Sequence, residues 1–367
     1  MKILLLSCST GEGHNHCALA VKEALDARGH ETSFLDMLHM FGDPGPLSFD
    51  KILNRISTKA PDVFGVMYHA GAMYSATGVT SPVYMANIRH ARQLNAFIRD
   101  NGYDAVVCSH LFPMETLTFL RRWERCDVKC YGILSDYTCI PFLAETELDG
   151  YFLPHEAVRA DCMAAGMPAE KLIVSGMPVA AKFTAPMTKQ AARELLGLPQ
   201  DKRIYLIMTG GIGCGDAVTL CEAIRRVPDE DALLCVLPGR NEELRTTLEE
   251  KYAGHGVLTV PFTDQVPAYM HAADVLLSKA GGISSAEAAV LGVPLVHTMA
   301  IPGVETKNAA FFAAHGMSFF AQNPDEAARF ADRLIFDAKA RKRMLAAQNA
   351  ELPKDAAARI AASLEHS

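Results

Sequence analysis

A histidine follows a glycine-rich loop near the start of the chain, where it could act as a general base. The loop, Ser9-Thr10-Gly11-Glu12-Gly13-His14, separates an apolar run at residues 2–7 from an amphipathic helical pattern. An imidazole titrates near neutral pH, and free amides at the start of a helix favour a developing negative charge. The loop lacks the GxGxxG spacing of a dinucleotide site and the Lys-Ser/Thr pair of a P-loop. Two interpretations of His14 stay open: a base, or a residue that only closes a turn or caps the helix.

A second glycine-rich loop lies at residues 209–216, again between an apolar run and a helical pattern. It has four glycines within seven residues, namely Gly210, Gly211, Gly213 and Gly215. Backbone amides at such a strand-to-helix junction can bind a pyrophosphate. The alternative, a glycine-rich turn without a ligand, fits this junction less well.

A third loop, Lys279–Glu287, contains two adjacent glycines and leads into another helical pattern. We expect Ser284 or Ser285 to cap that helix and Glu287 to fall in its first turn, where the helix dipole favours a carboxylate. The glycines could then cradle a phosphate while Glu287 binds ribose hydroxyls. The alternative is a plain capping box without a ligand.

A fourth loop, Ile301–Asn308, carries two polar residues that share one face of the following helix. Glu305 and Asn308 lie one helical turn apart. Their side chains could bind the hydroxyls of a sugar, or they could simply form a polar surface.

The elements that must position these loops alternate between strands and helices along the whole chain. Short apolar runs separated by amphipathic helices predict parallel sheets covered on both faces, and such sheets bind ligands beyond the carboxyl ends of their strands. Strands are expected at residues 2–7, 31–35, 105–109, 129–134, 151–153, 172–175, 203–208, 233–237, 257–260, 275–278, 295–298 and 317–320. Helices are expected at residues 18–28, 216–226, 241–252, 266–272, 284–291, 306–315, 324–336 and 338–349.

The chain has 367 residues, which is longer than a single hydrophobic core usually supports. We therefore predict an α/β protein of two Rossmann-like domains whose parallel sheets face a cleft. The N-terminal domain is expected at 1–178 and the C-terminal domain at 179–350. A C-terminal helix at 351–367 is expected to pack back on the N-terminal domain.

Residues 37–99 interrupt the alternation and contain no clear strand. Prolines, aromatic residues and methionines are interspersed there with lysines and arginines. Apolar helices of this kind can lie in a membrane interface, although ordinary helix packing with Phe and Met in the core explains the composition as well. We predict a helical insertion in the first domain.

Composition argues against several classes of protein. The net charge of −7, without a basic patch, speaks against nucleic acid as a partner. The ten cysteines occur singly, as expected in a reducing, cytoplasmic compartment. Neither Cys8 and Cys17 nor Cys126 and Cys130 have the matching partners of a zinc site, so we predict no metal. The apolar N-terminal run is too short for a signal peptide, and no run reaches the ~20 residues that span a bilayer.

Taken together and in order, these motifs resemble a known family of GT-B glycosyltransferases. The family contains the monogalactosyldiacylglycerol synthases, the processive diacylglycerol glucosyltransferases and, more distantly, the peptidoglycan glycosyltransferase that makes lipid II. The similarity covers nearly the whole chain, and Lys279–Glu287 carries its most specific motif, K-x-G-G-x-x-x-x-E. The other matching segments are Gly11–His14, Asp136, Leu237–Asn241, Phe262–Thr263 and Pro302–Asn308.

The resemblance implies a role for each of these positions. His14 would deprotonate the acceptor hydroxyl, with Asp136 as its partner or as a rival for that role. The diphosphate would lie on Gly211, Gly281 and Gly282, and Glu287 would hold the ribose. Further substrate-binding residues would be Gly11, Gly13, Arg240, Phe262, Thr263, Gly303, Glu305 and Asn308, of which Arg240, Phe262 and Thr263 flank the uracil.

The resemblance also implies the reaction. The chain would be an inverting hexosyltransferase that uses a UDP-sugar, needs no cofactor or metal, and glycosylates a lipid acceptor such as diacylglycerol. Helix N-termini and loop amides can stabilise the UDP leaving group in place of a metal, and no DxD-type acidic pair lies in a suitable loop. The protein would be cytoplasmic and could associate peripherally with the inner face of the plasma membrane through residues 37–99.

Three positions depart from the family pattern. Ile140 and Leu143 replace a histidine and a tryptophan after Asp136, and Val304 replaces a glutamine before Glu305. The first two concern the acceptor and the third concerns the identity of the sugar. Two alternatives therefore stay open: an epimerase acting on UDP-N-acetylglucosamine or a nucleotide-sugar hydrolase of the same fold, and a nucleotide-sugar binder without catalysis.

Overall fold

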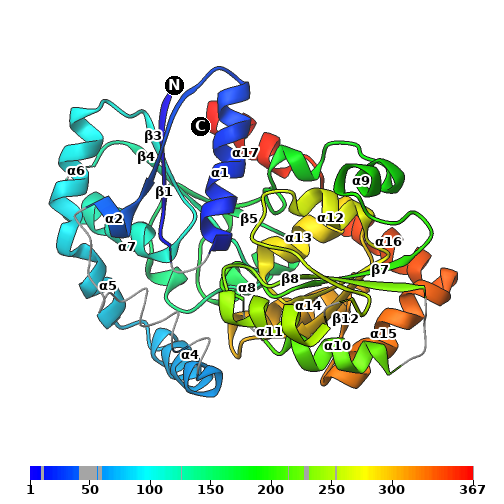
Figure 1. Ribbon diagram of the computed structural model, residues 1–367. Helices are drawn as coiled ribbons and strands as arrows, with labels where there is room; N and C mark the ends of the chain where they lie inside the picture. The colour runs from blue at the N-terminus through cyan, green and yellow to red at the C-terminus, as the bar shows by residue number, and fades with distance from the viewer. Residues whose placement is uncertain are drawn as a thin grey trace. The chain divides into compact units, whose positions relative to one another are not determined.

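The structure is a computed structural model that describes residues 1–9, 12–40, 56, 60–124, 126–213, 215–226, 231–252 and 254–366. Contacts within the chain divide it into two compact units. The first unit comprises Met1–Ala181, Ile301–Val304 and Pro353–Ser367, and the second comprises Lys182–Ala300 and Glu305–Leu352. Each unit has a six-stranded parallel sheet, as the strand and helix pattern predicted (Figure 1).

The first sheet has the strand order β2-β1-β3-β4-β5-β6. Its strands are β1 (Lys2–Ser7), β2 (Glu31–Asp36), β3 (Ala105–Cys108), β4 (Lys129–Ile133), β5 (Gly150–Leu153) and β6 (Leu172–Val174). The chain leaves β1 toward β2 on one side and later returns to place β3 on the other side. The strand order therefore reverses between β1 and β3, and in open parallel sheets such a switch point is where ligands bind.

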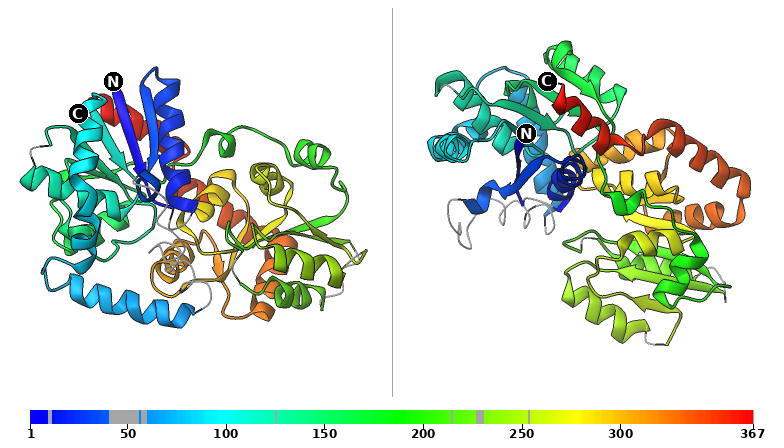
Figure 2. Two further views of the ribbon diagram at one scale, coloured as in Figure 1. Left: turned by 60° about the vertical axis from the view of Figure 1, so that its left-hand side comes forward. Right: turned by 90° about the horizontal axis from the view of Figure 1, so that it is seen from above.

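The described α-helices of this unit are α1 (Glu12–Ala27), α2 (Met37–Met40), α4 (Pro61–Ser75), α5 (Pro82–Asn87), α6 (Ala91–Asp100), α7 (Leu111–Trp123), α8 (Glu156–Ala164) and α17 (Ala356–Glu365). Helix α17 lies beside α1, and the Glu365 carboxylate accepts from His30 Nε2 at 2.8 Å and pairs with Arg28 (Figure 2). The prediction that the first helix begins at residue 18 was wrong, because α1 already starts at Glu12.

Residues from the predicted insertion form α2, α4, α5 and α6, whereas 41–55 and 57–59 lie outside the described residues. Helix α4 buries only Gly65. Apart from Asp62 and His69, its exposed residues are apolar, and we call them the α4 apolar face: Val63, Val66, Met67, Ala70, Met73 and Tyr74. Among the described helices, none is long and apolar enough to cross a membrane.

The second sheet has the order β12-β11-β10-β7-β8-β9. Its strands are β7 (Arg203–Met208), β8 (Ala232–Leu237), β9 (Val257–Thr259), β10 (Val275–Lys279), β11 (Leu295–Met299) and β12 (Phe319–Phe320). Its helices are α9 (Lys189–Leu196), α10 (Ala217–Arg225), α11 (Glu242–Tyr252), α12 (Val266–Ala272), α13 (Gly282–Leu291), α14 (Val304–Ala314), α15 (Pro324–Phe336) and α16 (Ala338–Glu351). The strand order reverses between β7 and β10, so their carboxyl ends form the switch point of this unit.

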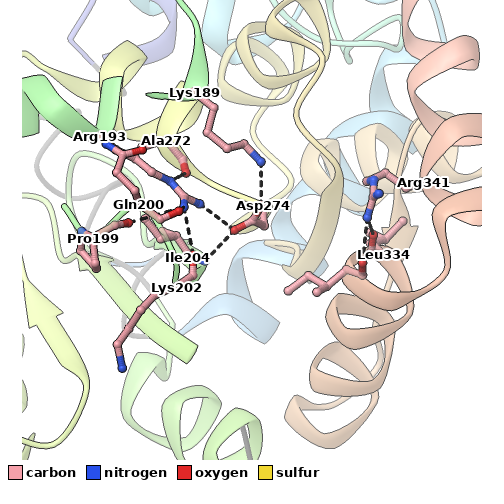
Figure 3. Close-up of polar contacts among 11 residues, drawn as sticks. Lys189, Arg193, Pro199, Gln200, Lys202, Ile204, Ala272, Asp274, Leu334 and Arg341 are labelled. Carbon is pink, nitrogen blue, oxygen red and sulfur yellow. Dashed lines mark hydrogen bonds and ion pairs between the residues drawn. The ribbon is translucent and has the colours of Figure 1, made fainter. Parts of the chain in front are cut away.

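A buried polar network holds the amino ends of β7 and β10. Arg193 is buried and donates to the Ala272 carbonyl at 3.0 Å and to Asp274 at 2.8 Å (Figure 3). A cavity of about 310 Å³ lies beside this network. Its basic side chains are already engaged, since Lys189 pairs with Asp274, and Arg341 donates to carbonyls at the end of α15. The cavity also lies at the opposite end of the strands from the glycine-rich loops, and we assign it no ligand.

Candidate functional site

His14 lies in the first turn of α1, at the switch point of the first sheet. Its Nδ1 atom is 2.9 Å from the carbonyl oxygen of Ser109 and 2.9 Å from Oγ of Ser135. Since a carbonyl can only accept, Nδ1 carries the proton. The neutral ring therefore keeps its lone pair on Nε2, which is the atom a general base needs.

The surroundings of His14 favour this neutral form. Its ring packs edge-on against that of His110, with centroids 4.5 Å apart. Burial lowers the pKa of His14 below its ordinary value, while the charge of Asp136 and the hydrogen bond to Ser109 act in the opposite direction. His110 caps α7 by accepting from the amide of Phe112, and burial together with His14 keeps its own pKa well below the usual range.

Asp136 and His14 line one small pocket of about 20 Å³, enough for about one water molecule. Burial raises the pKa of Tyr68 on α4 to about 12, with a further contribution from Asp136. The remaining wall of the pocket is largely apolar and includes Leu111, Met114, Ile133, Leu134, Ile140 and Leu143. The two departures from the family pattern after Asp136 thus both line this pocket.

In the second unit, the loop after β7 packs directly on the loop after β8. The Arg240 amide donates to the Gly211 carbonyl at 2.9 Å, and Asn241 Nδ2 donates to the Gly213 carbonyl at 3.0 Å. Gly213 and Gly239 both have positive φ, and a Cβ on either would collide with the backbone of the facing loop. These two glycines are therefore required by the packing between the loops, whether or not a ligand is bound.

Arg240 and Phe262 form an exposed stack beyond the ends of β8 and β9, with the guanidinium over the ring. The Arg240 guanidinium lies 4.1 Å from the centroid of the Phe262 ring, whose side chain is 57% exposed. Thr263 follows, and its Oγ1 accepts from the Gln265 amide at 3.1 Å. Exposed aromatic and guanidinium planes of this kind suit a flat heterocycle.

Helix α13 begins two residues earlier than expected. Its N-cap is Gly281, so Gly282 opens the helix and Glu287 lies in the second turn. The prediction that Ser284 or Ser285 caps this helix was wrong, as was the placing of Glu287 in the first turn. Glycine is tolerated at an N-cap although it has no side chain to accept from the first amides of the helix, and the Gly281 amide itself donates to the Lys279 carbonyl at 3.0 Å. Burial raises the pKa of Glu287 to about 8, although Lys182 opposes the shift.

His297 on β11 links this strand to α13. Its Nε2 lies 2.9 Å from Oγ of Ser285, and its Nδ1 lies 3.1 Å from Oγ of Ser318. Burial lowers the pKa of His297 to about 3. A neutral imidazole donates with one nitrogen and accepts with the other, so both contacts can be hydrogen bonds.

Glu305 and Asn308 are both buried on α14, so the alternative of surface polarity was wrong for them. Asn308 Nδ2 donates to the Ala280 carbonyl at 3.3 Å, and Glu305 pairs with Lys279. Gly303 instead belongs to the first unit and has a φ of 110°. A Cβ there would lie 2.7 Å from the ring of Tyr68.

The described candidate residues thus lie beyond the carboxyl ends of the strands in each unit. His14 and Asp136 meet in the first unit, with Gly13 in the first turn of α1, while Gly11 lies outside the described residues. Gly211, Arg240 and Phe262 form one group in the second unit, and Gly281, Glu305 and Asn308 form another. Sequence reasoning did not single out Ser109, Ser135, His110 or His297, and it gave Lys279 a place in a motif but no role. The one available signal was position, since Ser109 ends one predicted strand and Ser135 directly follows another.

Two family models together match most of the chain. Residues 14–179 match the model of monogalactosyldiacylglycerol (MGDG) synthase, and residues 214–359 match that of the glycosyltransferase family 28 C-terminal domain. The chain is 24% identical over 342 residues to a processive diacylglycerol beta-glucosyltransferase of Bacillus licheniformis, covering 92% of this chain and 87% of the relative. The same enzyme of Bacillus cytotoxicus is 25% identical over 322 residues, covering 86% and 80%.

Solved structures with the same fold include MurG of Acinetobacter baumannii, with a TM-score of 0.65 and 14% identity over 100% of this chain and 99% of that chain. The UDP-GlcNAc 2-epimerase of Neisseria meningitidis has a TM-score of 0.62 and 13% identity over 100% of both chains. At these identities the likeness concerns the fold alone, and it confirms the expected GT-B class.

Proposed function

We propose that this chain transfers a hexose from a UDP-sugar to diacylglycerol with inversion. The chain belongs to the glycosyltransferases with an MGDG synthase region and a family 28 C-terminal domain, and it is a UDP-sugar-dependent hexosyltransferase. The product would be a glycolipid. The observation that carries the acceptor proposal is His14, which keeps its lone pair on Nε2 and lines a pocket with a largely apolar wall.

His14 is the proposed base. The acceptor oxygen attacks the anomeric carbon as His14 Nε2 takes the hydroxyl proton, and the bond from that carbon to the diphosphate breaks with both electrons leaving on UDP. The Nδ1 hydrogen bond to Ser109 fixes the ring in the tautomer that this step needs. Asp136, which lines the same pocket, favours the imidazolium that forms, because its charge raises the pKa of His14.

The second unit would bind the donor. Uracil fits the stack of Arg240 and Phe262, and the ribose hydroxyls fit the buried carboxyl of Glu287. The diphosphate fits the N-terminus of α13 at Gly281 and Gly282, where backbone amides can stabilise the charge that develops on UDP. Glu305 and Asn308 are proposed to contact the sugar.

A lipid acceptor must reach the protein from a bilayer, and the α4 apolar face is the surface proposed to dock there. Val66 is 70% exposed and Met73 is 76% exposed, so these side chains are not part of a core. An apolar helical stripe can bury its side chains at the boundary between lipid headgroups and acyl chains. The proposed place of the reaction is therefore the inner surface of the plasma membrane.

The test is UDP release from UDP-glucose, UDP-galactose and UDP-N-acetylglucosamine, each with and without diacylglycerol micelles, for wild type and His14→Ala. We expect lipid-dependent release that falls about 10²- to 10⁴-fold in the variant, the usual contribution of a general base. Release without lipid would instead favour the epimerase or hydrolase. Binding of UDP without turnover of any donor would favour the non-catalytic binder.

A further inference from the structure

Lys279 occupies the switch point of the second sheet. It is the last residue of β10, and its ammonium pairs with Glu305 in the first turn of α14. Both side chains are largely buried, with 22% and 9% of their areas exposed. The sequence motif contains this lysine, but neither the motif nor the proposed mechanism gives it a role.

The glycine loop after β7 makes room for this lysine. A Cβ on Gly210 would lie 2.6 Å from Cε and 3.3 Å from Cδ of Lys279. On the other side, a Cβ on Gly281 would lie 3.6 Å from Nζ. The aliphatic chain therefore crosses Gly210, and the ammonium lies beside the N-cap of α13, between two segments proposed to hold the diphosphate.

A cation is needed at this position when a diphosphate is bound. A diphosphate carries about two negative charges, and Glu305 adds a buried carboxylate close to the same place. Without a cation between them, the two anions would repel each other in surroundings where water screens poorly. An ammonium has three N–H donors and can serve a carboxylate and a phosphate oxygen together.

We propose that Lys279 binds the diphosphate of the donor while it remains paired with Glu305, and so neutralises the charge of the departing UDP. This inference rests on the proposed function, because it requires a UDP-sugar at this end of the sheet. Lys279 contacts the leaving group, whereas Gly210 acts on it only by leaving space for the lysine side chain.

The test compares UDP with uridine, which lacks the phosphates, as ligands of the full chain. UDP binding is measured by calorimetry and uridine binding by ligand-observed NMR. For Lys279→Met we expect UDP affinity to fall at least tenfold and uridine affinity to stay unchanged, with partial recovery of UDP binding in Lys279→Arg. A general collapse of the site would reduce the affinity for both ligands.

Gly210→Ala provides an independent test that leaves the lysine in place. The added methyl must displace Lys279, so UDP affinity should fall while uridine affinity is kept. The matched control is Gly292→Ala, because Gly292 has nearly the same φ, +75° against +77°, and no atom within 4 Å of the added methyl. The control therefore places an alanine at a similar positive φ without moving a side chain.

Two results would overturn the inference, and they can be told apart. Equal UDP affinity in wild type and Lys279→Met would exclude Lys279 as a diphosphate ligand and leave the proposed function intact. A wild-type protein that binds neither UDP nor uridine would overturn the proposed function and this inference with it.

Discussion

The burial of His14 leads to a prediction about how the rate of transfer depends on pH. Burial lowers the pKa of His14, so the base should stay neutral and active below its ordinary titration range. The rate of transfer at low donor concentration should therefore fall only at a pH below 6.5, the ordinary value of histidine. The measurement is the pH profile of kcat/KM for the donor between pH 5 and 8.

Asp136→Asn provides the companion measurement. The charge of Asp136 raises the pKa of His14, so its removal should move the acid limb of the profile to still lower pH. If Asp136 were itself the base, the variant would lose activity at every pH instead. A shifted profile and an abolished one thus distinguish the two candidates.

Glu287 should make UDP binding depend on pH. Burial raises its pKa to about 8, so the carboxyl is mostly protonated at pH 7 in the empty protein. If the carboxylate form accepts from both ribose hydroxyls, binding must release this proton. UDP affinity should then rise up to tenfold for each pH unit between 6 and 8.

Calorimetry in buffers of different ionisation enthalpy measures that proton release directly. Glu287→Gln should bind more weakly and lose the pH dependence. An affinity that stays constant from pH 6 to 8 in the wild type would exclude ionisation of Glu287 on binding.

At the scale of elements, a buried carboxyl joins α7 to α5. Glu115 on α7 is fully buried and accepts from Asn87 on α5. Burial raises the pKa of Glu115 to about 9, and nearby Glu145 adds to the shift, while Asn87 opposes it. Between pH 4.5 and 9 the unfolded chain therefore binds fewer protons at this residue than the folded chain, and the free energy of unfolding falls as the pH rises.

Glu115→Gln keeps an oxygen that can accept from Asn87 and removes the ionisation. Relative to wild type, the variant should gain stability with rising pH, by at most about 1.4 kcal/mol per pH unit. Urea unfolding followed by circular dichroism between pH 5 and 8 measures this difference. The exposed Glu170→Gln is the control, and parallel pH curves for wild type and Glu115→Gln would contradict the prediction.

The strands could be predicted closely from the sequence because each is a short apolar run between polar turns. The start of α1 could not, because its first turn carries glycine and polar residues rather than apolar ones. Periodicity detects the buried face of a helix and misses a turn that faces a site. The same limit explains α13, where a glycine takes the N-cap position usually held by serine.

The partners of the candidate residues were harder to predict than the residues themselves. Ser109 and Ser135 contact His14 from loops far along the chain, and only the strand order brings the three together. His297 shows no sign of its role in the sequence, because its contacts depend on where β11 passes under α13. Gly213 and Gly239 have to be glycines because an added Cβ would collide with the backbone of the facing loop, and the sequence does not show that these two loops pack together.

For the molecule as a whole, membrane association should depend on apolar contact rather than on attraction between opposite charges. The net charge is −7, whereas the α4 apolar face exposes large hydrophobic side chains. The double variant Val66→Glu/Met73→Glu should reduce sedimentation with phosphatidylglycerol-containing vesicles several-fold, and added salt should weaken wild-type binding only slightly.

Met163→Glu is the matched control for this prediction. Met163 is 48% exposed on α8, so the substitution adds one of the double variant's two negative charges to the same unit, away from α4. Equal sedimentation of wild type and the double variant would contradict docking through the α4 apolar face. An equal loss in the control would point to charge alone.

Helix α17 gives the first unit a particular order of assembly during synthesis. Ile360 and Leu364 are buried on this helix, which packs beside α1, yet the ribosome makes them after every residue of the second unit. Until then α1 lacks the neighbour that completes its surroundings. Synthesis of the N-terminal unit therefore begins first, but the unit is completed last. While the second unit is being made, the surface of α1 that α17 later covers is open to aggregation.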